Sequence, residues 1–268
     1  MKNQSAGISK HGKGRFESVQ DKRSERLQKI QSINFNIFTD SARQAKTGKS
    51  RFIEGLEKYW VISLELTPNA RTCAYAFAKG FECTNNGEGC INWAGNGKFP
   101  IVRGARDRRT DQVLNQWPMA ETMIKADLAL ALAVAQSRGD RLVVRLDTFS
   151  SLHLWNRDQF YSDVIKPYQE KGVIFYDYIK APLKRIKAGI AKGIDLTVSF
   201  TEQTTDGELA EYMKIARVAV VFDGAIPDMW RGYRVINGDD HDLRFTEQRS
   251  VIVGLTSKNI KGGKLRSE

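Results

Sequence analysis

Residues 173–222 read VIFYDYIKAPLKRIKAGIAKGIDLTVSFTEQTTDGELAEYMKIARVAVVF, and this alternation sets the architecture of the chain. Three short apolar runs rich in β-branched and aromatic residues, 173–178, 196–200 and 218–222, predict buried strands. Two longer periodic segments between them, 182–192 and 207–215, predict helices. Strands that alternate with helices in this way favour βαβ units and a parallel sheet.

The same pattern extends in both directions along the chain. Apolar runs at 60–66 and 142–146 predict two earlier strands, with a long helix centred on 120–135 and another at 157–170. Residues 233–236 and 251–255 predict two later short strands around an insertion. Five or six such units are too few for an eight-fold barrel. We therefore expect an α/β fold, either an incomplete (β/α) barrel or an open, mostly parallel sheet with flanking helices.

Composition limits the class of protein. The chain has 268 residues, 41% of them hydrophobic, which is enough for one core. No apolar stretch is long enough to span a bilayer and the first residues carry no apolar secretory signal, so we expect a soluble intracellular protein with no membrane partner. Three cysteines do not form a paired disulfide framework, which favours a reducing compartment.

The net charge of +11 is concentrated at the two ends of the chain. Residues 1–50 carry a net +7 and residues 257–268 a net +3, which leaves only +1 for residues 51–256. The sequence thus predicts a basic, partly disordered N-terminal segment (1–50), a single α/β domain (51–256) and a basic C-terminal tail (257–268). Such tails bind the phosphates of DNA or RNA non-specifically, or serve only to keep a protein soluble.

Polar residues follow the predicted strands at the points where they end. Because the carboxyl ends of parallel strands meet at one edge, where ligands bind in α/β folds, we expect their side chains to surround one cavity. The residues expected there are Cys73, Asp147, Asp177 or Tyr178, Glu202, Asp223 and His241.

The cysteines lie within eighteen residues of one another in the loop after the first of these strands. Cys73, Cys83 and Cys90 could hold an iron–sulfur cluster or zinc, because glycines between them let the backbone fold around a small ion. A zinc site needs a fourth ligand, such as His153 or His241. Inert thiols are the alternative, since the C-x9-C-x6-C spacing matches no common metal motif.

A glycine turn follows Cys90 and leads into a basic helix. Gly95 and Gly97 precede Arg103, Arg106 and Arg109. Backbone N–H groups and arginines in this order could bind the phosphates of a cofactor or substrate. A tight turn before a solvated helical face explains the pattern equally well.

The densest polar cluster is residues 239–242, DDHD, in which carboxylates and an imidazole could hold a cation or act as acid and base. An ordinary turn is the alternative. The predicted catalytic residues are Asp147, Tyr178, Lys180, Glu202, Asp239 and His241.

Four segments together resemble a known family. They are CINWAGNG (90–97), RLD (145–147), FYDYIK (175–180) and NGDDHDLRF (237–245) followed by VIVGL (251–255). This combination resembles an uncharacterised bacteriophage family, the gene-product-88-like proteins. The resemblance covers roughly residues 60–256 and implies a phage protein in the cytoplasm of the host bacterium, without implying an activity.

A weaker likeness is to radical S-adenosylmethionine enzymes, which place three cysteines after the first strand of an incomplete barrel. The spacing here differs from their CxxxCxxC motif, and no Gly-Gly-Glu follows the second strand.

The sequence leaves three hypotheses for function. The first is an iron–sulfur enzyme of this kind that modifies nucleic acid or nucleotides. The second is a non-catalytic phage accessory protein that binds DNA, RNA or a host protein. The third is a metal-dependent nuclease or a replication protein built on the acidic cluster.

Overall fold

The computed structural model describes residues 33–40, 53–56, 58–76 and 99–257 of the chain. The chain divides into two units, Met1–Asn34 and Phe35–Glu268. The second unit contains every element described below. Most of the two predicted basic tails lies outside the described residues, as do Cys83, Cys90, Gly95 and Gly97.

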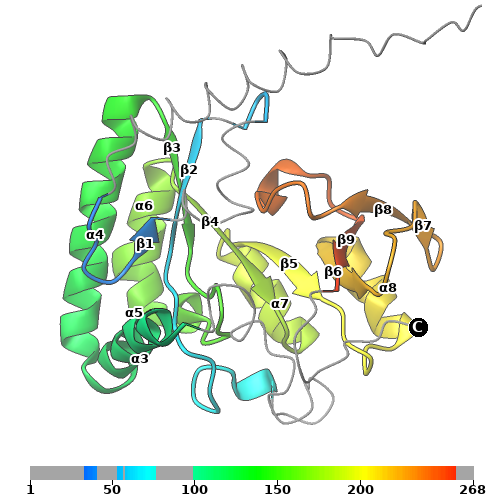
Figure 1. The fold of residues 1–268 in the computed structure, drawn as a ribbon, viewed down its shortest axis with the longest axis horizontal. Helices are drawn as coiled ribbons and strands as arrows, with labels where there is room; N and C mark the ends of the chain where they lie inside the picture. The colour runs from blue at the N-terminus through cyan, green and yellow to red at the C-terminus, as the bar shows by residue number, and fades with distance from the viewer. Residues whose placement is uncertain (1–32, 41–52, 57, 77–98, 258–268) are drawn as a thin grey trace, which may run out of the picture. The chain divides into compact units, whose positions relative to one another are not determined.

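One mixed sheet organises this unit (Figure 1). Its strands follow the order β1-β2-β3-β4-β5-β6-β9-β8-β7. Neighbours from β2 to β8 are all parallel, and only the two-residue strands β1 and β7 at the edges pair antiparallel. The bounds are β1 Thr39–Asp40, β2 Tyr59–Ser63, β3 Arg141–Arg145, β4 Ile174–Ile179, β5 Asp195–Ser199, β6 Arg217–Phe222, β7 Met229–Trp230, β8 Tyr233–Asn237 and β9 Ile252–Thr256. The predicted open, mostly parallel sheet is thus confirmed, and it does not close into a barrel.

Helices connect the first five parallel strands. They are α3 (Pro100–Asn115), α4 (Trp117–Arg138), α5 (Asp158–Phe160), α6 (Lys166–Glu170), α7 (Leu183–Ala191) and α8 (Asp206–Ile215). Each crossover from β2 to β6 moves one strand in the same direction, so right-handed connections place the helices on one face of the sheet. In agreement, α4 packs on β3, α7 on β5 and α8 on β6.

Local sequence explains where two of these helices begin and end. Thr205 and Glu208 form a reciprocal capping box at the start of α8, where each side chain accepts a hydrogen bond from the other residue's backbone N–H. α4 ends at Gly139, whose φ of 69° is the left-handed conformation that glycine adopts without strain.

The other face of the sheet is covered by the chain itself. Residues 238–251, which we call the β8–β9 crossover, connect two parallel strands without an α-helix and contain only the short helix η7 (Arg244–Thr246). Leu243 of this crossover packs with Val61, Val143 and Tyr176 in a buried cluster, and η7 contacts β5. The predicted insertion between the last two strands is therefore a layer of the core.

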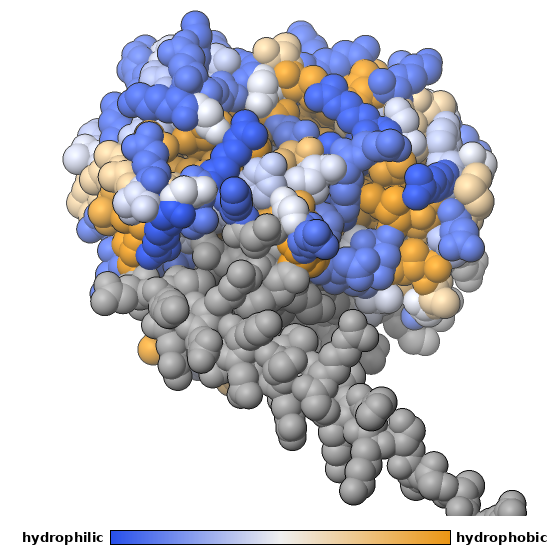
Figure 2. Space-filling view, turned by 90° about the horizontal axis from the view of Figure 1, so that it is seen from above, coloured by the Kyte–Doolittle hydropathy of each residue, from blue (hydrophilic) through white to orange (hydrophobic). Residues whose placement is uncertain are grey.

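Apolar and polar residues alternate over the visible surface (Figure 2). Hydrophilic residues separate the hydrophobic ones on the described part of the face shown there. No α-helix within the described ranges has the length and apolar character needed to cross a membrane.

Candidate functional site

The loops after β2 and β3 lie against each other at the carboxyl edge of the sheet. The backbone N–H of Ser151 donates to the carbonyl of Thr72 at 2.8 Å, and that of Leu64 donates to the carbonyl of Arg145. Two loops that are distant in sequence therefore form one surface, as expected where neighbouring parallel strands end.

Asp147 organises the second of these loops, residues 147–153, which we call the Asp147 loop. Its Oδ1 accepts from the hydroxyl of Ser150 at 2.7 Å and the N–H of Leu152 at 2.9 Å, and its Oδ2 accepts from the N–H of His153 at 2.8 Å. The residue is only 2% exposed. A buried carboxylate needs such partners, and these three fix the loop around it.

His153 ends this loop in an unusual state. Its φ of 55° is left-handed, the residue is 2% exposed, and its ring stacks with those of Tyr75 and Trp155. Neither ring nitrogen has a hydrogen-bond partner among the described residues. Burial lowers the pKa of His153. The negative charge of Asp147 opposes this change, and the positive charge of Arg185 adds to it. Strained backbone and an unpartnered buried imidazole together are typical of a functional site.

Asp177 on β4 lies directly beside the Asp147 loop. Its Oδ2 accepts from the N–H of Asp147 at 2.8 Å, and its Oδ1 is 3.3 Å from Nε of Arg145. Burial, with the nearby charge of Asp147 second, raises the pKa of Asp177 to about 8, although Arg145 opposes this change. Asp177 can therefore keep a proton near neutral pH.

Arg145 joins this strand end to the β8–β9 crossover. Its Nη1 is 2.7 Å from Oδ2 of Asp242, and the other oxygen of Asp242 accepts from the hydroxyl of Tyr178 at 3.1 Å. Its guanidinium also lies 4.9 Å from the ring centroid of Tyr178. Burial raises the pKa of Tyr178, and Asp242 adds to this. Tyr178 is thus a neutral hydrogen-bond donor that holds the crossover.

A second buried ion pair lies within the crossover. Arg244 is fully buried and its Nη1 is 2.7 Å from Oε1 of Glu247. Burial raises the pKa of Glu247 to about 7, although Arg244 and Arg217 oppose this change. His241 accepts the N–H of Leu243 on Nδ1, and burial lowers its pKa. The contacts of His241 are thus with the crossover itself.

The arginines of α3 differ in their surroundings. Arg106 is buried, pairs with Glu65 at 3.2 Å and lies over the ring of Phe149 at 3.7 Å. Arg103 and Arg109 are half-buried. Burial lowers the pKa of Arg109, although Glu65 opposes this change. Arg106 therefore attaches α3 to the Asp147 loop through its contact with Phe149. Arg103 and Arg109 lie on the same helix.

The predicted cysteine site is only partly described. Cys73 is buried, and its Sγ lies 3.9 Å from both the carbonyl oxygen of Phe149 and Oγ1 of Thr72. It thus borders the Asp147 loop. Cys83 and Cys90 are outside the described residues. Within the ranges that the structure covers, no three His, Cys, Asp or Glu side chains are arranged to hold a metal.

The other predicted site residues spread along the carboxyl edge. Glu202 and Asp223 are exposed after β5 and β6, and Lys180 is half-buried after β4. Asp239 follows β8 and accepts hydrogen bonds from Thr256 on β9. The described contacts therefore bring together Cys73, Asp147, Asp177 and His153 on one side, and they link neither Glu202 nor Asp223 to this group.

The sequence pattern named three participants without predicting how they interact. Asp177 was weighed as an alternative to Tyr178, although both contribute to the contacts with Arg145 and Asp242. Arg145 was noted only within the segment RLD and Asp242 only within the acidic cluster 239–242, and the pairing of the two was not predicted. A charged residue near the end of an otherwise apolar strand, as in RLVVRLD, is the signal that could have found Arg145.

Comparison with family models gives a match to Gene product 88 over residues 36–267, which is most of the chain. The chain belongs to the Gene product 88 family. This confirms the predicted resemblance to gene-product-88-like proteins. No curated protein and no solved structure matches it significantly. The likeness to radical S-adenosylmethionine enzymes finds no support in these comparisons.

Proposed function

We propose that this Gene product 88 protein is a phage enzyme that acts on nucleotides or nucleic acid, with its active site at the carboxyl ends of β2, β3 and β4. The state of His153 carries the proposal: a left-handed backbone, a buried ring and two ring nitrogens without a described partner. Such a ring costs stability unless a ligand or substrate engages it.

The chemistry expected of this site is acid–base catalysis. A lowered pKa keeps His153 neutral at pH 7, so one ring nitrogen can accept a proton from a substrate. Asp147 acts as a positioning residue, because it holds the backbone of His153 rather than its ring. Asp177, Tyr178 and Lys180 are further candidates to line the site from β4 and the residue that follows it.

The proposed substrate class rests on α3. Arg103 and Arg109 are half-buried on a helix that Arg106 attaches to the Asp147 loop. Guanidinium groups suit phosphate because they offer two parallel donors with a fixed positive charge. Gly95 and Gly97 precede this helix in the sequence and extend the proposed phosphate-binding region.

A metal bound by Cys73, Cys83 and Cys90 forms part of the proposal. The position of Cys73 beside the Asp147 loop supports it. Anaerobically purified protein should contain iron or zinc, and Cys90→Ala should lose the metal. If the purified protein contains no metal, the three cysteines do not form a metal site, and the proposed acid–base site at His153 remains.

Product analysis tests the enzyme directly. The full chain is incubated with nucleotides and with DNA and RNA oligonucleotides, single- and double-stranded, and products are identified by mass spectrometry. We expect turnover, and we expect His153→Asn to lower it by about 10²-fold or more because acid–base groups contribute this much. Asparagine tolerates a left-handed backbone, so the variant should fold. Turnover unchanged in His153→Asn would overturn the assigned site.

A non-catalytic binding protein is the second candidate. It is favoured by the β8–β9 crossover, which fills the face of the sheet that an incomplete barrel would leave open for a substrate. Saturable binding of an oligonucleotide or of a host protein, without any product, would select this candidate. Both candidates would act in the host cytoplasm, and the basic tails would add non-specific attraction to DNA or RNA.

A further inference from the structure

The helix that follows β4 carries a positive charge close to His153. α7 begins at Leu183, soon after the carboxyl end of β4, so its first turn lies at the same edge of the sheet as the Asp147 loop. Arg185 is in this first turn and is half-buried. Because the Cα–Cβ bonds of a helix tilt toward its N-terminus, the side chain of Arg185 extends toward this edge.

A glycine fixes the position of α7 against the rings at this site. Gly189 lies one turn after Arg185 on the same face of the helix. A Cβ on Gly189 would lie 3.0 Å from Cη2 and 3.1 Å from Cζ2 of Trp155, so only a bare backbone lets this ring pack so closely. The ring of Trp155 stacks with that of His153, with 5.4 Å between their centroids. The face of α7 that carries Arg185 is therefore held at the His153 site.

The contacts of Arg185 leave its charge without a carboxylate. Its guanidinium carbon lies 5.4 Å from the ring centroid of Tyr75, which stacks in turn with His153. No carboxylate of the described residues forms an ion pair with it. Four other arginines each have such a partner: Arg106 pairs with Glu65, Arg145 with Asp242, Arg217 with Asp195 and Arg244 with Glu247. Arg185 is thus a half-buried cation that is available to an anionic ligand.

The neighbours of Arg185 also offer hydrogen-bond donors. Nε1 of Trp155 is buried and has no acceptor in the part of the chain that the structure describes, and the same holds for both ring nitrogens of His153. A neutral imidazole donates from one of its nitrogens, and an indole can only donate. Three side chains thus present donors, one of them charged. A ligand rich in acceptor oxygens and negatively charged suits this set.

We propose that Arg185 binds the phosphate group of the substrate that lies next to His153. The planar guanidinium offers parallel donors that match the oxygens of a phosphate. The inference rests on the proposed function and deepens it, because it assigns the residue that holds a phosphate beside the acid–base group. The arginines of α3 would then bind other phosphates of the same ligand.

Titration of the full chain with inorganic phosphate tests the proposal, with the ring signals of the histidines followed by NMR at constant ionic strength. The chain has three histidines, and His153→Asn identifies the signal of His153. We expect phosphate to shift this signal saturably. Arg185→Gln should weaken the affinity read from this shift at least about tenfold, because a charged hydrogen bond contributes this much. Arg185→Lys should lose less, since it keeps the charge without the planar fork.

Lys187→Gln is the matched control, since it removes the same charge from an exposed position two residues along α7, on the other side of the helix. Its affinity for phosphate should equal that of the unmodified chain. The proposal fails if Lys187→Gln and Arg185→Gln weaken binding equally, or if phosphate leaves the signal of His153 unshifted in the unmodified chain. The second outcome needs no variant, so it decides even if Arg185→Gln does not fold.

Turnover separates this proposal from the proposed function. If turnover depends on His153 but phosphate does not shift its signal, the role of Arg185 is overturned and the enzyme remains. If phosphate binds through Arg185 but no nucleotide or oligonucleotide is turned over, the phosphate site is supported and the enzyme is overturned.

Discussion

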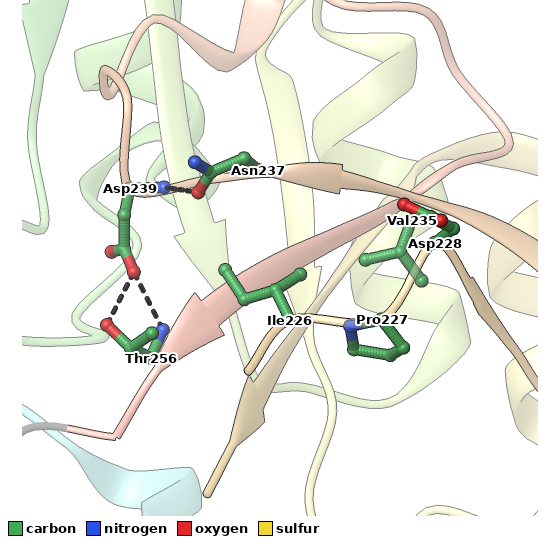
Figure 3. Close-up of a pocket in the computed structure, with 7 residues that line it drawn as sticks. All are labelled: Ile226, Pro227, Asp228, Val235, Asn237, Asp239 and Thr256. Carbon is green, nitrogen blue, oxygen red and sulfur yellow. Dashed lines mark hydrogen bonds between the residues drawn. The ribbon is translucent and has the colours of Figure 1, made fainter. Parts of the chain in front are cut away.

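Two aspartates that follow strands at the same edge of the sheet have different surroundings. Asp147 after β3 is 2% exposed and accepts three hydrogen bonds within its own loop. Asp239 after β8 is half-buried, lines a pocket and accepts two hydrogen bonds from Thr256 (Figure 3). Both look alike in sequence, as an acid just beyond an apolar run. Burial accounts for the difference, because the first carboxylate is enclosed by its own loop and the second stays partly in contact with water.

The largest expected effect separates these two aspartates. Asp147→Ala removes the acceptor for two backbone N–H groups and one hydroxyl in a buried loop, which should lower the free energy of unfolding by roughly 3–5 kcal/mol. Asp239→Ala should lower it by only about 1 kcal/mol because water can replace the lost partner. Chemical denaturation measures both. Equal losses would show that burial does not distinguish the two sites.

The sequence predicted the sheet well because the order of the elements along the chain is the order of the strands in space. Each apolar run from 142–146 to 218–222 became the next parallel strand, with a helix between. The last two strands break this rule, since β9 lies between β6 and β8. The crossover between them carries charged residues inward, and no periodicity in NGDDHDLRF indicates that Arg244 is fully buried.

The candidate site was harder to predict, because each key interaction joins residues far apart in the chain. Arg145 meets Asp242 across ninety-seven positions, and only the fold of the crossover brings them together. The state of His153 depends on rings from two different loops. Strand ends indicate an edge of the sheet, but pattern alone does not distinguish its buried side chains, such as Asp177, from exposed ones such as Glu202.

The free energy of unfolding, measured over a range of pH, tests the raised pKa of the buried Asp177. A folded pKa of about 8 means that folded Asp177 keeps a proton that the unfolded chain releases near pH 4. The folded state therefore binds more protons between these values, so the free energy of unfolding should fall as pH rises from about 4 to 8. A difference of about four in pKa corresponds to roughly 5 kcal/mol, and Asp177→Asn should remove this part of the fall. Identical slopes for Asp177→Asn and the unmodified chain would contradict the raised pKa.

The smallest effects are expected at the exposed strand ends. Glu202→Gln and Asp223→Asn should each change the free energy of unfolding by less than about 0.5 kcal/mol, as surface substitutions usually do. They should also leave turnover unchanged, because the described contacts do not connect them to His153. Thermal unfolding and product analysis check both expectations. A clear loss of turnover in either variant would extend the active site to β5 or β6.

We propose above all that a phosphate-bearing ligand binds at the carboxyl ends of β2–β4. Fluorescence anisotropy of a labelled single-stranded oligonucleotide, titrated with the full chain over a range of salt, tests it most directly. The double variant Arg103→Gln/Arg109→Gln is compared with Lys125→Gln/Lys214→Gln, which removes the same charge from exposed helical positions. We predict that the arginine variant loses at least about tenfold in affinity for the oligonucleotide. The slope of its log affinity against log salt concentration should fall by the amount expected for roughly two lost phosphate contacts. The lysine variant should stay close to the unmodified chain in both quantities. Equal losses in the two variants would contradict a site at this edge of the sheet.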